Sequence, residues 1–126
     1  MINKFLEKKS AYFYFAFRII IGLLFMLHGI QKLPGIFNGN TAIFSLIALA
    51  ALIEVIGGLF LVIGLLTRYI SLISAIEMLF AYFMAHASNG LSPLANRGEA
   101  AVLFFAAFLV MAAFGSGKWA IGNLKR

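Results

Sequence analysis

The sequence predicts an all-α membrane protein: an antiparallel bundle of four transmembrane helices in a single domain, residues 1–126. Hydrophobic residues make up 63% of the chain, and its mean hydropathy is +1.03. Charged residues make up 11%, whereas a soluble domain has about 25%. Four apolar stretches of about 17–25 residues, the length that a spanning helix needs, are joined by short breaks that favour antiparallel neighbours.

Local breaks set the bounds of each predicted helix. The basic N-terminus and first apolar run resemble a signal peptide, but the run is too long, Arg18 interrupts it and no small-x-small cleavage site follows, so we expect a retained helix. Pro34 ends the first stretch, Thr67-Arg68 makes a turn after the second, and Gly115-Ser116-Gly117 ends the fourth. The predicted helices cover residues of about 12–30, 42–66, 70–87 and 98–114.

The distribution of Lys and Arg predicts the orientation. Eight of these residues fall at one predicted end of the bundle and two at the other, and the richer end belongs in the cytoplasm. Both termini are therefore expected in the cytoplasm. The net charge of +6 reflects contact with lipid headgroups, and no basic domain for nucleic acid exists outside the apolar stretches. The cytoplasmic set is Lys4, Lys8, Lys9, Arg18, Arg68, Lys118, Lys125 and Arg126; the outer set is Lys32 and Arg97.

Three of the four acidic residues, Glu54, Glu77 and Glu99, lie in three different apolar stretches. A charge in hydrocarbon costs at least about 2.5–3.5 kcal/mol, so three such residues indicate a shared polar interior. Glu54 has Gly57 and Gly58 nearby at helical spacing, and small residues mark close helix packing. It is expected to face the bundle interior, either as a functional group or as a hydrogen-bonding partner of a neighbouring helix.

The other charged residues have structural interpretations beside functional ones. Arg18 and Glu77 fall at similar predicted depths, so an intramembrane ion pair would neutralise both charges. Asn96 and Glu99 have the spacing of an N-cap and its N3 partner, and capping and function are both open for Glu99.

A polar cluster is predicted at the outer ends of the helices. His28 and Lys32 are four residues apart and project from one helix face. His86 lies near the outer end of the third helix, and Glu99 begins the fourth. One geometric condition applies to Glu77, which lies nine residues before His86 and so on the opposite side of a straight helix. Both can face one cavity only if the helix kinks or ends before His86.

Little in the sequence supports a metal or haem site. The chain has no cysteine, which removes disulfides, thiolate sites and iron–sulfur clusters. Two lone histidines are weak evidence for a haem, the Glu-x-x-His pairs of di-iron bundles are absent, and no spacing supports a mononuclear metal site. The cofactor is therefore open at this point.

An ordered series of motifs runs from about Phe13 to Gly122. It comprises Arg18 with Gly22, His28-Gly29 with Lys32, Glu54 with Gly57-Gly58, Gly64-Leu65-Leu66-Thr67-Arg68, Glu77-Met78, Ala81 to His86, Asn96-x-Gly98-Glu99 and Gly115-Ser116-Gly117-Lys118-Trp119.

This series resembles the DoxX family of small bacterial membrane proteins, with Arg97 as a departure from the glycine common there. The resemblance implies four transmembrane helices in the plasma (inner) membrane of a bacterial cell, and it makes a quinone the suspected cofactor. Members of the family are commonly labelled oxidoreductases, after a subunit that works with the quinone pool in thiosulfate oxidation. The resemblance leaves open whether this chain is an enzyme.

Three functions follow from these residues. In a quinone-linked redox subunit, Glu54, His86 and Glu99 would move protons, and Arg18, His28, Lys32 and Glu77 would hold the ligand. Electrons would then come from a redox partner protein. The alternatives are a proton-coupled transporter or exporter of small molecules, and a non-catalytic membrane anchor or assembly partner. The small-residue faces suit packing within one subunit or between subunits of an oligomer.

Overall fold

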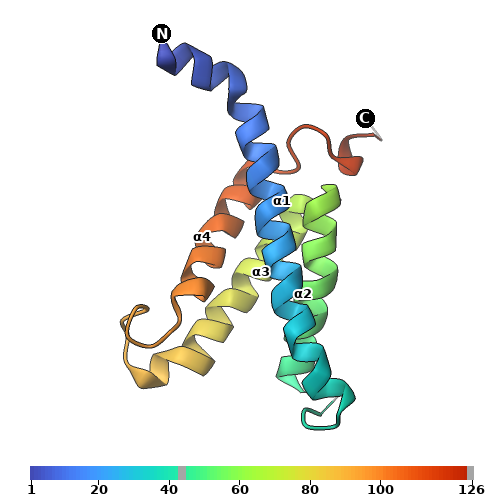
Figure 1. Ribbon diagram of the computed structural model, residues 1–126, viewed down its shortest axis with the longest axis vertical. Helices are drawn as coiled ribbons and strands as arrows, with labels where there is room; N and C mark the ends of the chain where they lie inside the picture. The colour runs from blue at the N-terminus through green and yellow to red at the C-terminus, as the bar shows by residue number, and fades with distance from the viewer. Residues whose placement is uncertain (43–44, 125–126) are drawn as a thin grey trace.

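The computed structural model describes residues 1–42 and 45–124, which form helices and connections without a strand (Figure 1). Residues 43–44 of the predicted second helix and residues 125–126 of the predicted basic end lie outside the described residues. The all-α fold is confirmed. The α-helices are α1 (Ile2–Phe37), α2 (Leu46–Ile63), α3 (Thr67–Ala81) and α4 (Glu99–Phe114), with a π-helix η1 (Tyr82–His86) and 3-10 helices η2 (Ala87–Asn89) and η3 (Ile121–Asn123).

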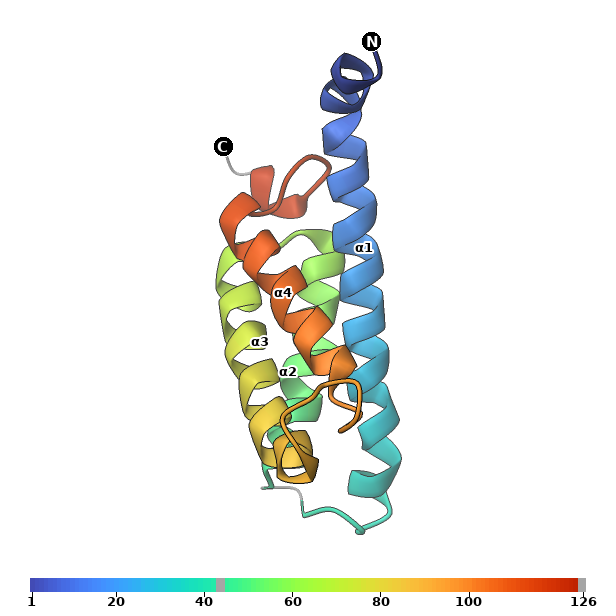
Figure 2. The same ribbon diagram turned by 90° about the vertical axis from the view of Figure 1, so that its left-hand side faces the viewer.

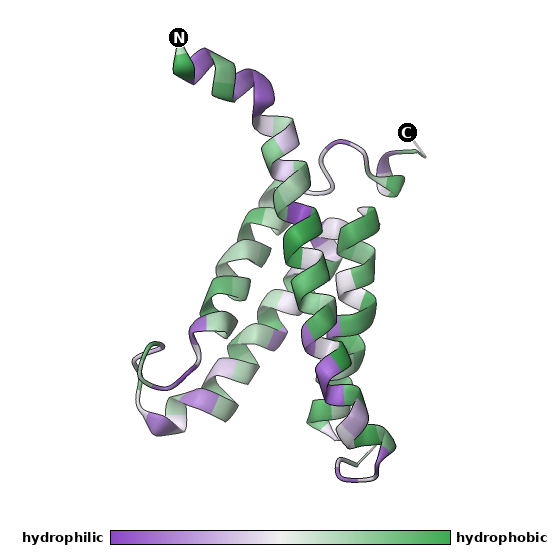
Figure 3. Cartoon of the chain, in the orientation of Figure 1, coloured by the Kyte–Doolittle hydropathy of each residue, from purple (hydrophilic) through white to green (hydrophobic). Residues whose placement is uncertain are grey.

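The helices have the length and composition of a membrane bundle. α1, α2 and the helical segment Thr67–Asn89 are each long and apolar enough to cross a bilayer. α4 is a shorter apolar helix of 16 residues. In Figure 3, hydrophobic residues cover the helices, whereas hydrophilic ones gather at the N-terminal end of α1 and near the connections. The apolar surface is therefore suited to lipid.

Helix α1 extends beyond the predicted range at both ends. No helix-breaking residue precedes Tyr12, so the helix already begins at Ile2. It also continues through Pro34 to Phe37, although this proline has no N–H to donate to the backbone one turn earlier. Figure 2 shows the N-terminal part of α1 projecting past the other helices.

Local capping fixes the bounds of α2. The Ser45 hydroxyl accepts a hydrogen bond from the Ala48 backbone nitrogen at 3.2 Å, which is the preferred N-cap arrangement. The helix ends at Gly64, whose φ of +73° lies in the left-handed region that glycine tolerates. The short turn that follows leads directly into α3 at Thr67.

The four helices are arranged as two antiparallel pairs. α1 packs along α2, and α3 packs along α4, while α1 hardly touches α3. Figure 1 shows the two pairs close together at the end that carries both termini and apart at the other end. The antiparallel bundle is thus confirmed, and the cytoplasmic location of the termini stays a prediction.

Glycines allow α1 and α2 to approach closely. A Cβ atom added to Gly58 would lie 2.6 Å from the Met26 backbone nitrogen, and one added to Gly22 would lie 3.0 Å from the Gly58 carbonyl oxygen. Farther along, a Cβ on Gly29 would lie 2.8 Å from the Cβ of Glu54. The backbones of the two helices are in contact at these points, which is how membrane helices pack without a hydrophobic driving force.

The core lies where α1 and α2 meet α3 and α4. The Phe25 ring of α1 lies 4.7 Å from the Phe108 ring and 5.6 Å from the Phe104 ring, measured between centroids, and both partners belong to α4. These aromatic contacts join the two helix pairs. The buried cluster consists of Phe25, Leu61, Ala75, Met78, Ala101, Phe104, Phe108 and Met111.

Candidate functional site

Lys32 of α1 and Glu54 of α2 form an ion pair inside the bundle. The Lys32 Nζ atom donates to Glu54 Oε2 at 2.5 Å. The Glu54 side chain is 1% exposed and the Lys32 side chain 32% exposed. Gly29, one helical turn before Lys32, brings α1 against the Cβ of Glu54. The close glycine contact therefore places the ammonium group beside the carboxylate.

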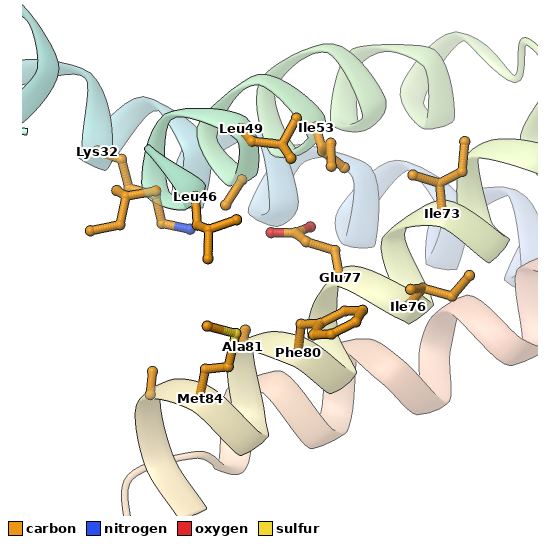
Figure 4. A pocket seen from close by; sticks show the side chains of 13 residues that line it. Lys32, Leu46, Leu49, Ile53, Ile73, Ile76, Glu77, Phe80, Ala81 and Met84 are labelled. Carbon is orange, nitrogen blue, oxygen red and sulfur yellow. The ribbon is translucent and has the colours of Figure 1, made fainter. Parts of the chain in front are cut away.

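Glu77 of α3 lies in a cleft between α2 and α3 (Figure 4). Both of its carboxyl oxygens are buried, and neither has a hydrogen-bond partner among the described residues. Figure 4 shows the carboxyl group pointing from α3 toward α2, with the Lys32 amine on the same side of the cleft. The cleft has a volume of about 810 Å³ and is lined by Lys32, Leu46, Ile47, Leu49, Ala50, Ile53, Ile73, Ile76, Glu77, Phe80, Ala81, Met84 and Ala85.

The cleft has apolar walls and one polar region. Its lining residues other than Lys32 and Glu77 are all apolar. Many of them are more than half exposed, including Leu46 at 65%, Ile76 at 55% and Phe80 at 62%. In a membrane bundle, such residues face lipid. The cleft therefore opens toward the bilayer and ends at a carboxyl group and an ion pair, an arrangement that suits an amphiphile.

His86 has a different setting from Glu77. The α-helical part of α3 ends at Ala81 and continues as the π-helix Tyr82–His86. The helix therefore changes before His86, which is the condition under which Glu77 and His86 could face one cavity. The changed helix does not bring His86 into the cleft lining. Its Nδ1 atom instead lies 3.1 Å from the Asn96 carbonyl oxygen, a contact to the connection before α4.

The remaining outer residues are also apart from the cleft. The His28 side chain is exposed, and its ring lies 5.4 Å from the Phe104 ring. Glu99 is the first residue of α4 and is exposed. Within residues 1–42 and 45–124, no group of three or more His, Asp and Glu residues could hold a metal ion.

Comparison with known proteins identifies the family. The family model described as DoxX matches residues 13–87, more than half of the chain. The chain belongs to the DoxX family. It is also similar to an uncharacterized protein of Haemophilus influenzae, with 36% identity over 94% of each chain. No solved structure matches. Family membership and the apolar helices together make this chain a multi-pass membrane protein.

The predicted Arg18–Glu77 ion pair is wrong for this DoxX protein. Arg18 is fully buried and donates hydrogen bonds to the carbonyl oxygens of Ser116, Lys118 and Trp119, the last two at 3.3 and 3.1 Å. The residues after α4 turn back across α1, because Gly115 and Gly117 adopt positive φ angles of 75° and 67°. Similar depth suggested the pair, but α1 packs on α2 and not on α3.

The predicted capping role of Glu99 is also wrong. The N-cap of α4 is Gly98, without a side-chain hydrogen bond to the helix. The Asn96 side-chain oxygen accepts from the Gly98 nitrogen at 2.8 Å, and its nitrogen donates to the Gly90 carbonyl oxygen at 2.8 Å. Asn96 therefore stabilises the connection before α4 and stands two residues before the N-cap.

Sequence reasoning missed the partnership of Lys32 with Glu54 in this DoxX protein. It assigned Lys32 to the outer ends of the helices because it ended the first helix at Ile30. The signal that could have found the pair is the alignment of glycines: Gly22 and Gly29 on α1 are seven residues apart, as is usual for a packing face, and Lys32 follows Gly29 by one turn.

Proposed function

We propose that this DoxX protein binds a hydrophobic small molecule of the quinone class in the cleft between α2 and α3, as a redox-associated membrane subunit. One observation carries the proposal. The Glu77 carboxyl group is buried without a partner among the described residues, in an apolar cleft that also contains Lys32. A buried polar group without a hydrogen bond is costly, and such groups concentrate at functional sites.

The chemistry of a quinone fits these groups. A quinone has two carbonyl oxygens that accept hydrogen bonds, and an apolar ring and tail. The Lys32 ammonium group is a donor for one carbonyl oxygen, and Glu77 is a donor when protonated. Reduction of a quinone to a quinol takes up two electrons and two protons. The protonated Glu77 carboxyl group would supply one proton and the Lys32 ammonium group, which is paired with Glu54, would supply the other. A redox partner protein would supply the electrons.

The apolar walls support entry from the bilayer. The exposed side chains of Leu46, Ile76 and Phe80 border the cleft, so an isoprenoid tail could remain among lipid chains while the head group contacts Glu77. Of the predicted site residues, Glu77 and Lys32 line the cleft, and Glu54 contributes only through its ion pair with Lys32. His28, His86, Glu99 and Arg18 neither line the cleft nor pair with a residue that does, and they take no direct part.

The test is binding of a short-chain benzoquinone analogue to the purified protein in lipid nanodiscs. A buried acceptor that loses its hydrogen-bond donor costs about 1–3 kcal/mol, so we expect Glu77→Leu, whose side chain has no donor, to weaken binding about tenfold. Glu99→Leu is the matched control, because Glu99 is exposed and outside the cleft. An absence of binding, or equal binding by the two variants, would contradict the proposal.

A second candidate is proton-coupled transport of a hydrophobic molecule. The observation that favours it is a carboxyl group without a partner in a cleft that opens toward lipid, because proton-driven transporters use such intramembrane acids. In proteoliposomes, a pH gradient would then drive substrate flux, and Glu54→Gln or Glu77→Gln would abolish it. Loss of stability in these variants, with neither binding nor flux in the wild type, would instead favour a membrane anchor.

A further inference from the structure

Helix α1 is longer than the hydrocarbon core of a bilayer is thick. It has 36 residues, which at a rise of 1.5 Å per residue span about 54 Å, whereas the hydrocarbon core is about 30 Å thick. Figure 2 shows its N-terminal turns beyond the ends of the other helices. These turns therefore need surroundings other than the bundle and the acyl chains around it.

Aromatic residues mark the level at which α1 leaves the bundle. The Tyr12 ring lies 4.9 Å from the ring of Trp119, measured between centroids, and Trp119 belongs to the segment after α4. Tyr69 lies in the first turn of α3, at the same end of the bundle, and all three side chains are more than half exposed. Tyr and Trp gather at the headgroup level of membrane proteins. Residues 2–11 therefore lie at or beyond the headgroups of the leaflet on the side of the termini.

The first turns of α1 have an apolar side that no other described part of the chain covers. Within residues 1–10, every residue except the half-buried Lys9 is exposed. The apolar residues recur at intervals of three and four positions, which places them on one side of the helix. An apolar side of this kind gains stability only when a layer covers it. This apolar side consists of Ile2, Phe5, Leu6 and Phe13, all exposed.

Three lysines accompany the apolar side. Lys4 and Lys8 are four residues apart and form a strip beside it. Lys9 lies on the apolar side itself, with its Nζ atom 5.0 Å from the centre of the Tyr12 ring. A lysine stem packs on apolar groups while its amine reaches a polar layer. Against these three cations the first eleven residues contain one acid, Glu7, so the segment is complementary in charge to an anionic surface.

The first turns are also inclined to the rest of α1. Figure 1 shows the N-terminal part of the helix turning aside above the end of the bundle that carries both termini. The Ser10 hydroxyl donates to the Glu7 carbonyl oxygen at 2.8 Å, and a serine bond to the preceding turn often bends a helix. The inclination turns the segment toward the plane of the membrane surface and away from a course straight into water.

We propose that residues 2–13 form an interfacial helix that docks on the leaflet at the end carrying the termini and binds anionic phospholipid headgroups. The apolar side enters the boundary between headgroups and acyl chains, and the three lysines contact the lipid phosphate groups. A helix with Phe and Leu on one side and Lys beside them is typical of such binding, and an anionic leaflet attracts each lysine. The inference is independent of the ligand proposed for the cleft.

A spin label on each side of the helix tests the docking. The chain has no cysteine, so one introduced cysteine carries a nitroxide at a single position. Phe5→Cys and Asn3→Cys lie on nearly opposite sides of the helix. In vesicles of phosphatidylcholine and phosphatidylglycerol, we expect the label at Phe5 to collide mainly with oxygen dissolved in the lipid and the label at Asn3 mainly with a water-soluble nickel complex. Equal nickel collision at both positions would place the segment in water and overturn the proposal.

Lysine substitutions test the choice of lipid. Each lysine near an anionic leaflet contributes about fivefold to the ratio of docked to free helix, so Lys4→Gln/Lys8→Gln/Lys9→Gln should lower this ratio about a hundredfold and open the label at Phe5 to nickel. Vesicles of phosphatidylcholine alone should also weaken docking. Lys118→Gln, which removes an exposed charge at the same end but outside α1, is the control and should leave the ratio unchanged.

Two results would contradict the choice of anionic lipid as the occupant. The first is docking that is equally strong in the triple variant and the wild type. The second is broadening of the label spectrum that requires two copies in one vesicle, which would show that a second copy of the chain covers the apolar side.

Discussion

On the α1 side of α2, a Cβ atom on Gly58 would lie 2.6 Å from the Met26 backbone nitrogen, whereas on the α3 side a Cβ on Gly57 would lie 3.3 Å from the Ile70 side chain. These neighbouring residues face two different interfaces. The first interface brings two backbones into contact, and the second contains the cleft with Glu77. A tight contact on one side of α2 thus holds Lys32 beside Glu54, while the looser side leaves room for a ligand.

The largest expected effect on the free energy of unfolding comes from adding a methyl group at Gly58, compared with adding one at Gly57. Gly58→Ala forces a methyl group against backbone atoms of α1 that cannot rotate away, and overpacking of this kind costs about 3 kcal/mol of unfolding free energy. Gly57→Ala meets the ends of side chains and should cost less than about 1 kcal/mol. Unfolding in detergent micelles, followed by circular dichroism, compares the two. Equal losses would show that α1 and α2 are not packed backbone to backbone.

A smaller effect is expected when the ion pair at the tight interface is broken. Lys32→Met leaves Glu54 buried without its partner, and we expect a loss of about 2 kcal/mol, between the values for exposed and fully buried pairs, because Lys32 is about one third exposed. Lys4→Met, at an exposed position of α1, is the control. The double variant Lys32→Met/Glu54→Gln should recover part of the loss, and strictly additive losses would argue against the pair.

The smallest effect on stability is expected at the loose interface. Glu77→Gln removes no hydrogen bond or ion pair within the described residues, so the free energy of unfolding should change by less than about 0.5 kcal/mol. The same unfolding assay checks this. Together with weakened ligand binding in Glu77→Leu, an unchanged stability in Glu77→Gln would assign Glu77 to function. A loss of unfolding free energy as large as that of Lys32→Met would instead indicate that the Glu77 side chain stabilises the fold.

Particular residues show why sequence reasoning succeeded for the fold and less well for the site. The chain break at Gly115 is a local signal, and α4 ends there as predicted. The turn predicted at Thr67-Arg68 was wrong, because the left-handed Gly64 already ends α2 and α3 begins at Thr67. Glu54 was expected in the interior because small residues surround it, and it is buried. The predicted partner of Arg18 was wrong. The prediction compared the depths of Arg18 and Glu77 along their own helices, but which helices are neighbours depends on how the bundle is assembled.

The sequence by itself determined the helices, their order and the family of this protein, because apolar length, helix breaks and motifs are properties of neighbouring residues. The tertiary structure decided which charged groups meet. Lys32 reaches Glu54 since glycines bring α1 and α2 together, and Glu77 faces a cleft since the two helix pairs diverge. Both outcomes depend on contacts between segments that are distant in the chain, and pairwise packing of helices in three dimensions sets those contacts.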